Sequence, residues 1–195
     1  MAKLTQHGKE TLKKQIPQAL KNPFRKKVQK RFDKIKKEMI EEFLLLPVTQ
    51  ELLQGPDGVN ISGTLGGVSN LFAFIGFDRG EEPILPIIQL LENTSLQFRK
   101  KIAENNKWGI MYNVSLPTAE KIFAITPMPW ATGRSWAQGI ERGISGLGFL
   151  LRKNNKGRSG AAIQTRVKVR GGKFNNTAYI SVFINKYKKR FKKLK

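Results

Sequence analysis

Few residues of this chain have the side-chain chemistry that catalysis or metal binding requires. His7 is the single histidine, and the sequence contains no cysteine. Catalytic triads and zinc sites need histidine or cysteine at several positions, so neither arrangement has support. The adjacent carboxylates Glu81 and Glu82 precede a proline, and neighbouring side chains point apart on regular structure. We therefore predict that the protein is not an enzyme and that it uses no metal ion or other cofactor.

Glycine is frequent between residues 55 and 80, but the stretch does not match a phosphate-binding loop. It lacks the Gly-Lys-Ser/Thr ending, and Gly-x-Gly-x-x-Gly is absent. We interpret residues 57–83 as a long structured contact loop, because ordered loops of this length are often functional surfaces. Its apolar side chains either touch a neighbouring subunit or close the core of the domain itself. The candidates for intersubunit contact are Leu71, Phe72, Phe74 and Phe77.

Positive charge is the strongest compositional signal. The 195 residues carry a net charge of +22. A compact protein with that charge repels itself, so we expect a polyanionic partner: nucleic acid, an acidic protein surface or anionic lipid. Residues 1–55 contain 13 basic and 6 acidic side chains, residues 56–141 contain 7 and 8, and residues 142–195 contain 16 and none. We predict that the two basic ends meet the partner.

The cations predicted to contact that partner lie in three segments near the two ends. On the first segment, the alternative is a solvated charged face on a core helix. No sequence-specific reading motif is recognisable, so any nucleic-acid contact would be to the backbone. Trp130, in a proline-bounded loop beside Arg134, is the best candidate for stacking on a base. The predicted contacts are Lys26, Lys27, Lys30, Arg31, Arg166, Lys168, Arg170, Lys188, Lys189 and Arg190.

Two amphipathic helices are predicted near the ends of the chain. Asn22 and Pro23 form a helix-start pair, and an apolar stripe at spacings of three and four residues follows until Pro47. Residues 1–21 are polar and basic, and we interpret them as a flexible arm before a single domain at 22–195. The predicted stripes are Phe24, Val28, Phe32, Ile35, Met39 and Phe43 in the first helix, and Tyr179, Ile180, Phe183, Ile184, Tyr187, Phe191 and Leu194 in the last.

Between these helices the sequence predicts short elements. Thr49 is a candidate cap for a short helix, and residues 87–92 are a second candidate. Residues 108–116 alternate as a strand does, with residues 120–126 as the returning strand of a hairpin. Ser135 has capping-box spacing before a helix at 136–142, and residues 149–152 with 162–170 form another hairpin. The predicted fold class is α+β: a curled antiparallel sheet of hairpins flanked by a long N-terminal helix and a C-terminal helix.

One stretch resembles a known family. Pro129-Trp-Ala-Thr-Gly-Arg-Ser-Trp-Ala-Gln-Gly-Ile140 is similar to the Thr-Gly-Arg segment of neck and tail-completion proteins of tailed bacteriophages. Residues 60–77 with Pro83-Ile84, and residues 139–148, resemble virion proteins of large contractile-tailed phages, including those infecting cyanobacteria. The long glycine-rich insertion departs from the small members of the family. In that family a long N-terminal helix precedes the segment, strands follow and a last helix closes the domain, and the order here is similar. Together the resemblance touches about half of the chain.

The resemblance implies a structural virion protein: a ring-forming neck, tail-completion or tail-terminator component that joins phage head and tail. Its expected partners are identical subunits in a ring and other virion proteins, with non-specific DNA contact left open. Its expected location is the virion, assembled in the host cytoplasm. No apolar run approaches the roughly 18 residues of a membrane span. The basic amphipathic last helix could lie on a membrane surface, but its Tyr and Phe residues suit protein packing equally well, so we expect no membrane contact. The alternative is a basic nucleic-acid-binding protein of ribosomal or nucleoid type.

Overall fold

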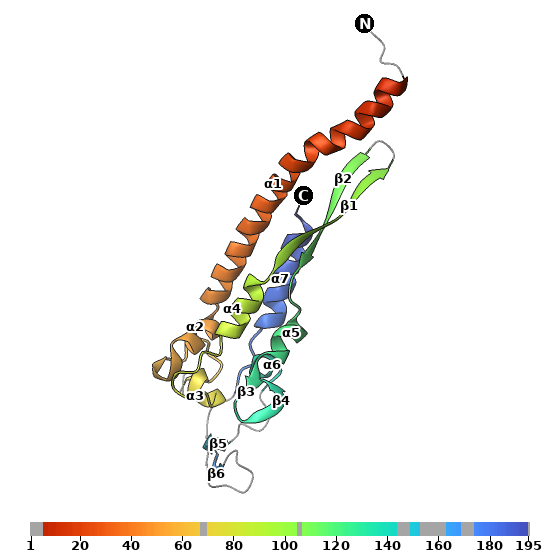
Figure 1. Ribbon diagram of the computed structural model, residues 1–195. Coiled ribbons are helices and arrows are strands. Elements are labelled where there is room, and N and C mark those ends of the chain that lie inside the picture. The colour runs from red at the N-terminus through yellow and green to blue at the C-terminus, as the bar shows by residue number, and fades with distance from the viewer. Residues whose placement is uncertain are drawn as a thin grey trace.

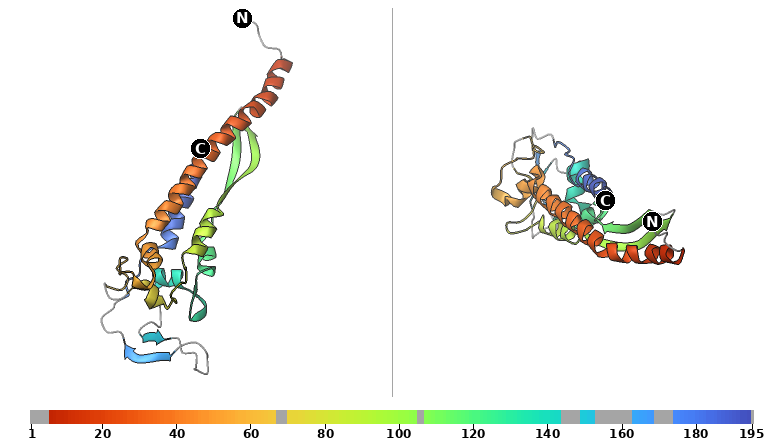
Figure 2. Two further views of the ribbon diagram at one scale, coloured as in Figure 1. Left: turned by 60° about the vertical axis from the view of Figure 1, so that its left-hand side comes forward. Right: turned by 90° about the horizontal axis from the view of Figure 1, so that it is seen from above.

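The structure, a computed structural model, describes residues 6–66, 70–104, 107–143, 149–152, 163–168 and 174–194. The molecule is elongated (Figure 1). The long helix α1 runs along one side, a hairpin of strands β1 and β2 lies beside its N-terminal half, and the short elements gather around its C-terminal end. The two turned views of Figure 2 keep this hairpin beside α1. The mixture of helix and sheet confirms the predicted α+β class.

The prediction of one curled sheet is wrong. Among the described residues, each strand pairs only with the partner of its own hairpin, which leaves separate two-stranded antiparallel sheets. No described strand of one hairpin pairs with a strand of another, and short helices separate the hairpins along the chain. The strands are β1 (Ser95–Glu104) with β2 (Lys107–Ser115), β3 (Pro127–Met128) with β4 (Ala131–Ser135), and β5 (Phe149–Arg152) with β6 (Ile163–Lys168).

Helix α1 spans Gln6–Leu45, so it begins well before the predicted start at Asn22 and Pro23. The segment predicted as an arm is therefore helical from Gln6 onward. Residues 9–21 are rich in Lys, Gln, Leu and Ala, which favour helix, and α1 continues through Pro17 despite the cost of a proline inside a helix. The helix start predicted at Asn22 and Pro23 is therefore wrong, and Pro23 lies inside the helix. Forty residues at about 1.5 Å each give a rod of about 60 Å.

The core forms where the C-terminal half of α1 packs against α7 (Ile180–Lys192). Val28, Phe32, Met39 and Phe43 are buried and Ile35 is half-buried, as the stripe predicts, whereas Phe24 is 52% exposed. The stripe of the last helix is confirmed too, since every predicted member up to Phe191 is buried. Both faces therefore follow from helical periodicity alone.

Short helices surround the C-terminal end of α1. Thr49 does not cap a helix as predicted; it lies inside one, where its buried hydroxyl meets the Tyr179 hydroxyl at 2.9 Å. The strand predicted at residues 120–126 is wrong: residues 119–124 form a helix, and the Thr118 hydroxyl caps it by accepting from the Lys121 amide. The helices are α2 (Pro47–Leu53), the 3₁₀ turn η1 (Gly55–Asp57), α3 (Leu71–Ile75), α4 (Leu85–Glu92), α5 (Ala119–Ala124) and α6 (Trp136–Arg142).

Other predicted elements are confirmed. The Ser135 hydroxyl accepts from the Gln138 amide at 3.1 Å, and this cap begins α6 with Trp136 and Ile140 buried. The β5–β6 pair matches the second predicted hairpin over its described residues. No helix of the described ranges is long and apolar enough to span a lipid bilayer.

Candidate binding surface

Helices α1 and α7 run antiparallel and bring the two basic segments of the chain together. The Phe32 and Phe191 rings lie 5.5 Å apart, and so do those of Phe43 and Phe183. Residue numbers therefore increase along α7 in the direction in which they decrease along α1. As a result, the basic C-terminal turns of α7 lie at the level of the basic middle of α1.

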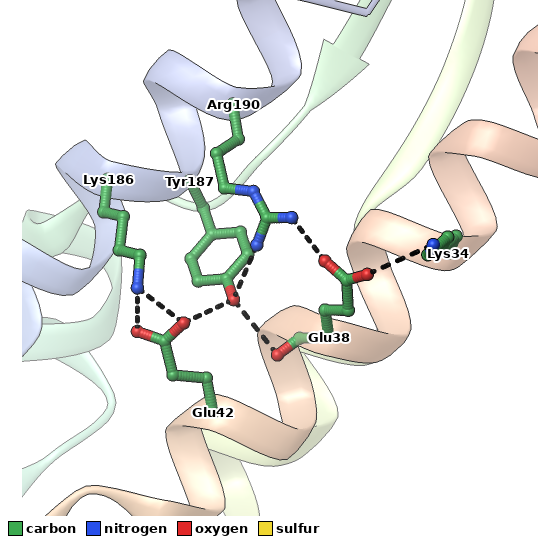
Figure 3. A network of polar contacts seen from close by, with 6 residues as sticks. All are labelled: Lys34, Glu38, Glu42, Lys186, Tyr187 and Arg190. Atoms are coloured by element: carbon green, nitrogen blue, oxygen red, sulfur yellow. Dashed lines mark hydrogen bonds and ion pairs between the residues drawn. The ribbon is translucent and has the colours of Figure 1, made fainter.

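A network of polar contacts fixes this pairing (Figure 3). The Lys186 ammonium donates to both carboxylate oxygens of Glu42 at 2.6 and 2.7 Å, and the Tyr187 hydroxyl donates to the same carboxylate at 2.8 Å. The Arg190 guanidinium donates to the Glu38 carboxylate and to the Tyr187 hydroxyl. We call these five residues the α1–α7 clasp. Arg190, predicted as a polyanion contact, thus has its charge engaged inside the protein.

The clasp shifts the titration of its members. Burial alone would raise the pKa of Glu42, but hydrogen bonds from Lys186 and Tyr187, together with nearby positive charge, hold that pKa below its ordinary value. Burial, and then the hydrogen bond to Glu42, raise the pKa of Tyr187 to about 12. The hydrogen bond to Glu38 raises the pKa of Arg190. These shifts favour an ionised Glu42 and a protonated Tyr187 and Arg190 near neutral pH, which are the states in which the clasp forms its hydrogen bonds.

Beyond the clasp, exposed cations cover the solvent side of both helices. Successive residues of an α-helix are about 100° apart, so Lys27 and Arg31 lie within roughly 20° of Glu38, on the flank that faces α7. By the same argument Lys193 lies on the flank of α7 that faces α1, in line with Lys186. We define the α1–α7 cationic face by its exposed members: Lys26, Lys27, Lys30, Arg31, Lys34, Lys189 and Lys193.

Neutralisation within this face is partial. Lys34 lies 4.0 Å from Glu38, and this exposed pair is worth little. Lys26, Lys27 and Lys30 form no ion pair with a carboxylate of the described residues. Lys26 and Lys30, together with Asp33, also line an open groove of about 620 Å³ on a side of α1 that is turned away from α7. The face therefore presents uncompensated positive charge along a rigid rod, which suits a polyanion rather than a small ligand.

Not all the predicted cations join this face. Lys188 lies on the other flank of α7, near Glu120. Hydrogen bonds lower the pKa of Glu120, and the charges of Lys188 and Arg142 lower it further. Arg166 and Lys168 lie in β6, at the end of the molecule opposite the N-terminal half of α1 (Figure 1). Arg170 lies outside the described residues. The structure thus brings together the cations of α1 and part of α7, and separates them from β6.

The predicted contact loop is held from within by Glu51, which the sequence analysis did not identify. This buried carboxylate accepts from the Leu71 amide at 2.6 Å, the Ser62 amide at 3.0 Å and the Asn60 side chain at 2.9 Å. Asn70 adds a second support, because its side chain donates to the Pro56 carbonyl at 2.6 Å and caps α3. Hydrogen bonds of the Glu51 and Asn70 side chains therefore hold the backbone of this loop in place.

The apolar residues of this loop pack on the protein's own core. Leu71 and Phe72 are 0% and 1% exposed, so the alternative prediction, closure of the core, describes them. Phe74 stacks on Phe174 at 6.0 Å, and Phe77 meets Trp136 edge-on at 6.0 Å. The predicted intersubunit contact stays a prediction, and only Phe74 and Phe77, which are half-buried, have surface for it.

Trp130 also packs against the protein's own core. Its indole nitrogen donates to the Ile75 carbonyl at 2.8 Å, and its ring contacts the space where a Gly76 side chain would be. Gly76 has a φ of 92°, which also favours glycine. A ring held in this way is poorly placed to stack on a base. The described residues contain no group of three or more His, Cys, Asp or Glu that could hold a metal ion.

No protein-family model matches this sequence, and comparisons with curated proteins and with solved structures found no significant match. The geometry of the chain itself therefore carries the functional argument.

Proposed function

We propose that this protein is a structural component of a macromolecular assembly, and that it binds a polyanion through the α1–α7 cationic face. The observation that carries the proposal is the convergence of two basic segments, more than 140 residues apart in sequence, on one exposed surface. The clasp fixes the two helices, so the face is preorganised and loses little conformational entropy on binding. Such a face suits a repeating anionic partner, which offers charge at many points.

Within this class, we propose a head–tail joining component of a tailed bacteriophage virion, in the neck or at the tail terminus. Support comes from the similarity of residues 129–140 to neck and tail-completion proteins, and from an elongated body with a rod and a hairpin that reach beyond the core (Figure 1). The polyanion would be DNA in the channel or the acidic surface of another virion protein. The proposed location is the virion.

A second candidate is a nucleic-acid-binding protein of ribosomal or nucleoid type. The net charge of +22 favours it equally, because backbone contact needs only placed cations. The two candidates differ in what the purified protein does without nucleic acid. A joining component should form a defined oligomer, visible by mass photometry and negative-stain microscopy. A monomer that changes mass only when RNA or DNA is added would support the second candidate and contradict the first.

The face itself is tested by salt dependence. Affinity for a short DNA duplex should fall by orders of magnitude between low and physiological salt, because bound counterions are released. Lys26→Gln with Lys27→Gln should lower the slope of log affinity against log salt by about 2, one for each lost phosphate contact. The matched control, Lys121→Gln with Arg134→Gln, removes two exposed cations elsewhere and should leave the slope unchanged. Equal slopes for both double variants would contradict the assignment.

A further inference from the structure

We propose that copies of this chain associate head to tail: the part of α1 around Phe24 of one copy occupies an apolar, acid-rimmed pocket between α2 and α4 of the next. The inference rests on the assembly role proposed above, and adds the surfaces and the partner, a second copy. It comes from two features far apart along the molecule, and neither has a complement among the residues of its own copy that the structure describes.

The pocket lies where α2, η1 and α4 meet. Its inner wall is made by the buried side chains of Leu52, Phe72 and Ile84, while Leu53 and Leu85 stand at its mouth with 52% and 43% of their surface exposed. Its volume is about 270 Å³, slightly below the roughly 300–1,000 Å³ of small-molecule sites. An apolar opening of this size suits a protruding side chain.

Two acidic residues line this pocket, although the protein as a whole is basic. The exposed residues Glu81 and Glu82 line it. Residues 38–98 contain nine acidic side chains and one basic one, Arg79, and Arg79 is paired with Asp57 at 2.8 Å. The pocket therefore favours an apolar group that carries positive charge beside it.

The N-terminal half of α1 presents such a group. Phe24 is 52% exposed, although it continues the apolar stripe whose next members, Val28 and Phe32, are buried. Lys27 follows it by three residues, so the aromatic ring and the ammonium group share one side of the helix. Lys27 is exposed and has no carboxylate partner among the described residues.

The two surfaces of one copy cannot meet each other. Both are attached to α1, and the 23 residues from Phe24 to Pro47 separate them by about 35 Å of helix. A second copy must supply the complement. Because the two surfaces differ, the contact is heterologous, and it closes into a ring or grows into a filament according to the rotation between copies.

The test uses two variants that each remove one surface. Phe24→Ser and Leu85→Ser should both convert the wild-type oligomer to a monomer in sedimentation or mass photometry. Mixing the two monomeric variants should produce a dimer and nothing larger, because each retains one intact surface. The control Val182→Ser, at a residue 60% exposed on α7, should leave the oligomer unchanged. Circular dichroism and melting temperature establish that each variant is folded.

Charge reversal adds a second measurement. Glu82→Lys and Lys27→Glu should each weaken association, and the two together in one chain should restore it. Folded variants that associate as the wild type does, or a mixture that stays monomeric, would overturn the inference. The inference would also be overturned if a pocket variant lost binding of a different protein while it still associated with itself.

These failures are distinct from failure of the proposed function. Phe24→Ser keeps every cation, so it should still bind a DNA duplex short enough for one copy, with the steep salt dependence that the cationic face predicts. If the wild type forms an oligomer that depends on neither Phe24 nor Leu85, only the head-to-tail inference fails. If the wild type stays monomeric at every concentration with and without a polyanion, the head-to-tail inference and the joining role both fail, and only polyanion binding, which the salt dependence tests, would remain.

Discussion

At the scale of single residues, Glu51 organises the glycine-rich loop. Its buried carboxylate accepts hydrogen bonds from Asn60, Ser62 and Leu71, which lie 9 to 20 positions away. Donors so distant in sequence leave no local pattern, so sequence reasoning did not single out this glutamate. By contrast, the cap at Ser135 was predictable because both partners lie within one turn.

The first prediction concerns this carboxylate. Glu51→Gln replaces one accepting oxygen with a donor that faces other donors, which should lower the free energy of unfolding by on the order of 3 kcal/mol. Urea denaturation would measure the loss, and hydrogen exchange at the Leu71 amide should accelerate. The control Glu82→Gln, at an exposed position, should change stability by less than about 0.5 kcal/mol. Equal effects of the two substitutions would contradict the role of Glu51.

The second prediction concerns the pH dependence of the α1–α7 clasp. The pKa of Glu42 is lowered from its ordinary value of 4.5, so the carboxylate adds stability that is complete above about pH 4.5 and is lost as pH falls through the folded pKa. Lys186→Met removes the main hydrogen bond responsible. It should therefore destabilise the protein near pH 7, by an amount that shrinks below about pH 4.5.

Chemical denaturation of both proteins across this pH range provides the measurement. Lys37→Met is the control, because Lys37 lies 3.7 Å from Glu41 in an exposed pair that contributes little. A loss from Lys186→Met that is the same at pH 7 and in acid would show that the clasp acts through packing and not through charge.

At the scale of elements, the helices were largely predictable and their pairing partners were not. The stripes of α1 and α7 follow the helical period, because burial on one side imposes it. Strand β2 was found from its alternation, yet its partner was assigned to residues 120–126 instead of β1. Strand β2 could form a hairpin with the segment before it or with the segment after it. The segment after it begins a helix, which the Thr118 hydroxyl caps, so β2 pairs with β1.

The third prediction tests the packing of α1. Phe32 is 3% exposed and lies 5.5 Å from the Phe191 ring, so Phe32→Ala should cost about 3–5 kcal/mol in unfolding free energy. Leu45→Ala, in the same helix but at a residue 72% exposed, should cost less than about 0.5 kcal/mol. An unchanged melting temperature for Phe32→Ala would contradict the buried interface between the helices.

At the scale of the whole molecule, charge is distributed unevenly, and the sequence totals conceal this. The middle of the chain appears nearly neutral when residues 56–141 are counted together, but residues 38–98 are strongly acidic. The fold gathers these acidic residues around the C-terminal end of α1 and places cations along the rest of the rod and on α7. Only the antiparallel packing of α1 on α7 shows which cations lie close together, because the segments are distant in sequence.

The most direct test of the central claim is lysine footprinting of the wild-type protein. Acetylation of each lysine is followed by mass spectrometry with and without a partner, using a short DNA duplex in one arm and polyglutamate in the other. We expect protection of Lys26, Lys27, Lys30 and Lys189 in at least one arm, loss of that protection at high salt, and no protection of the exposed residue Lys121 on α5. Protection spread evenly over all exposed lysines, or absent from the α1–α7 cationic face in both arms, would contradict the claim.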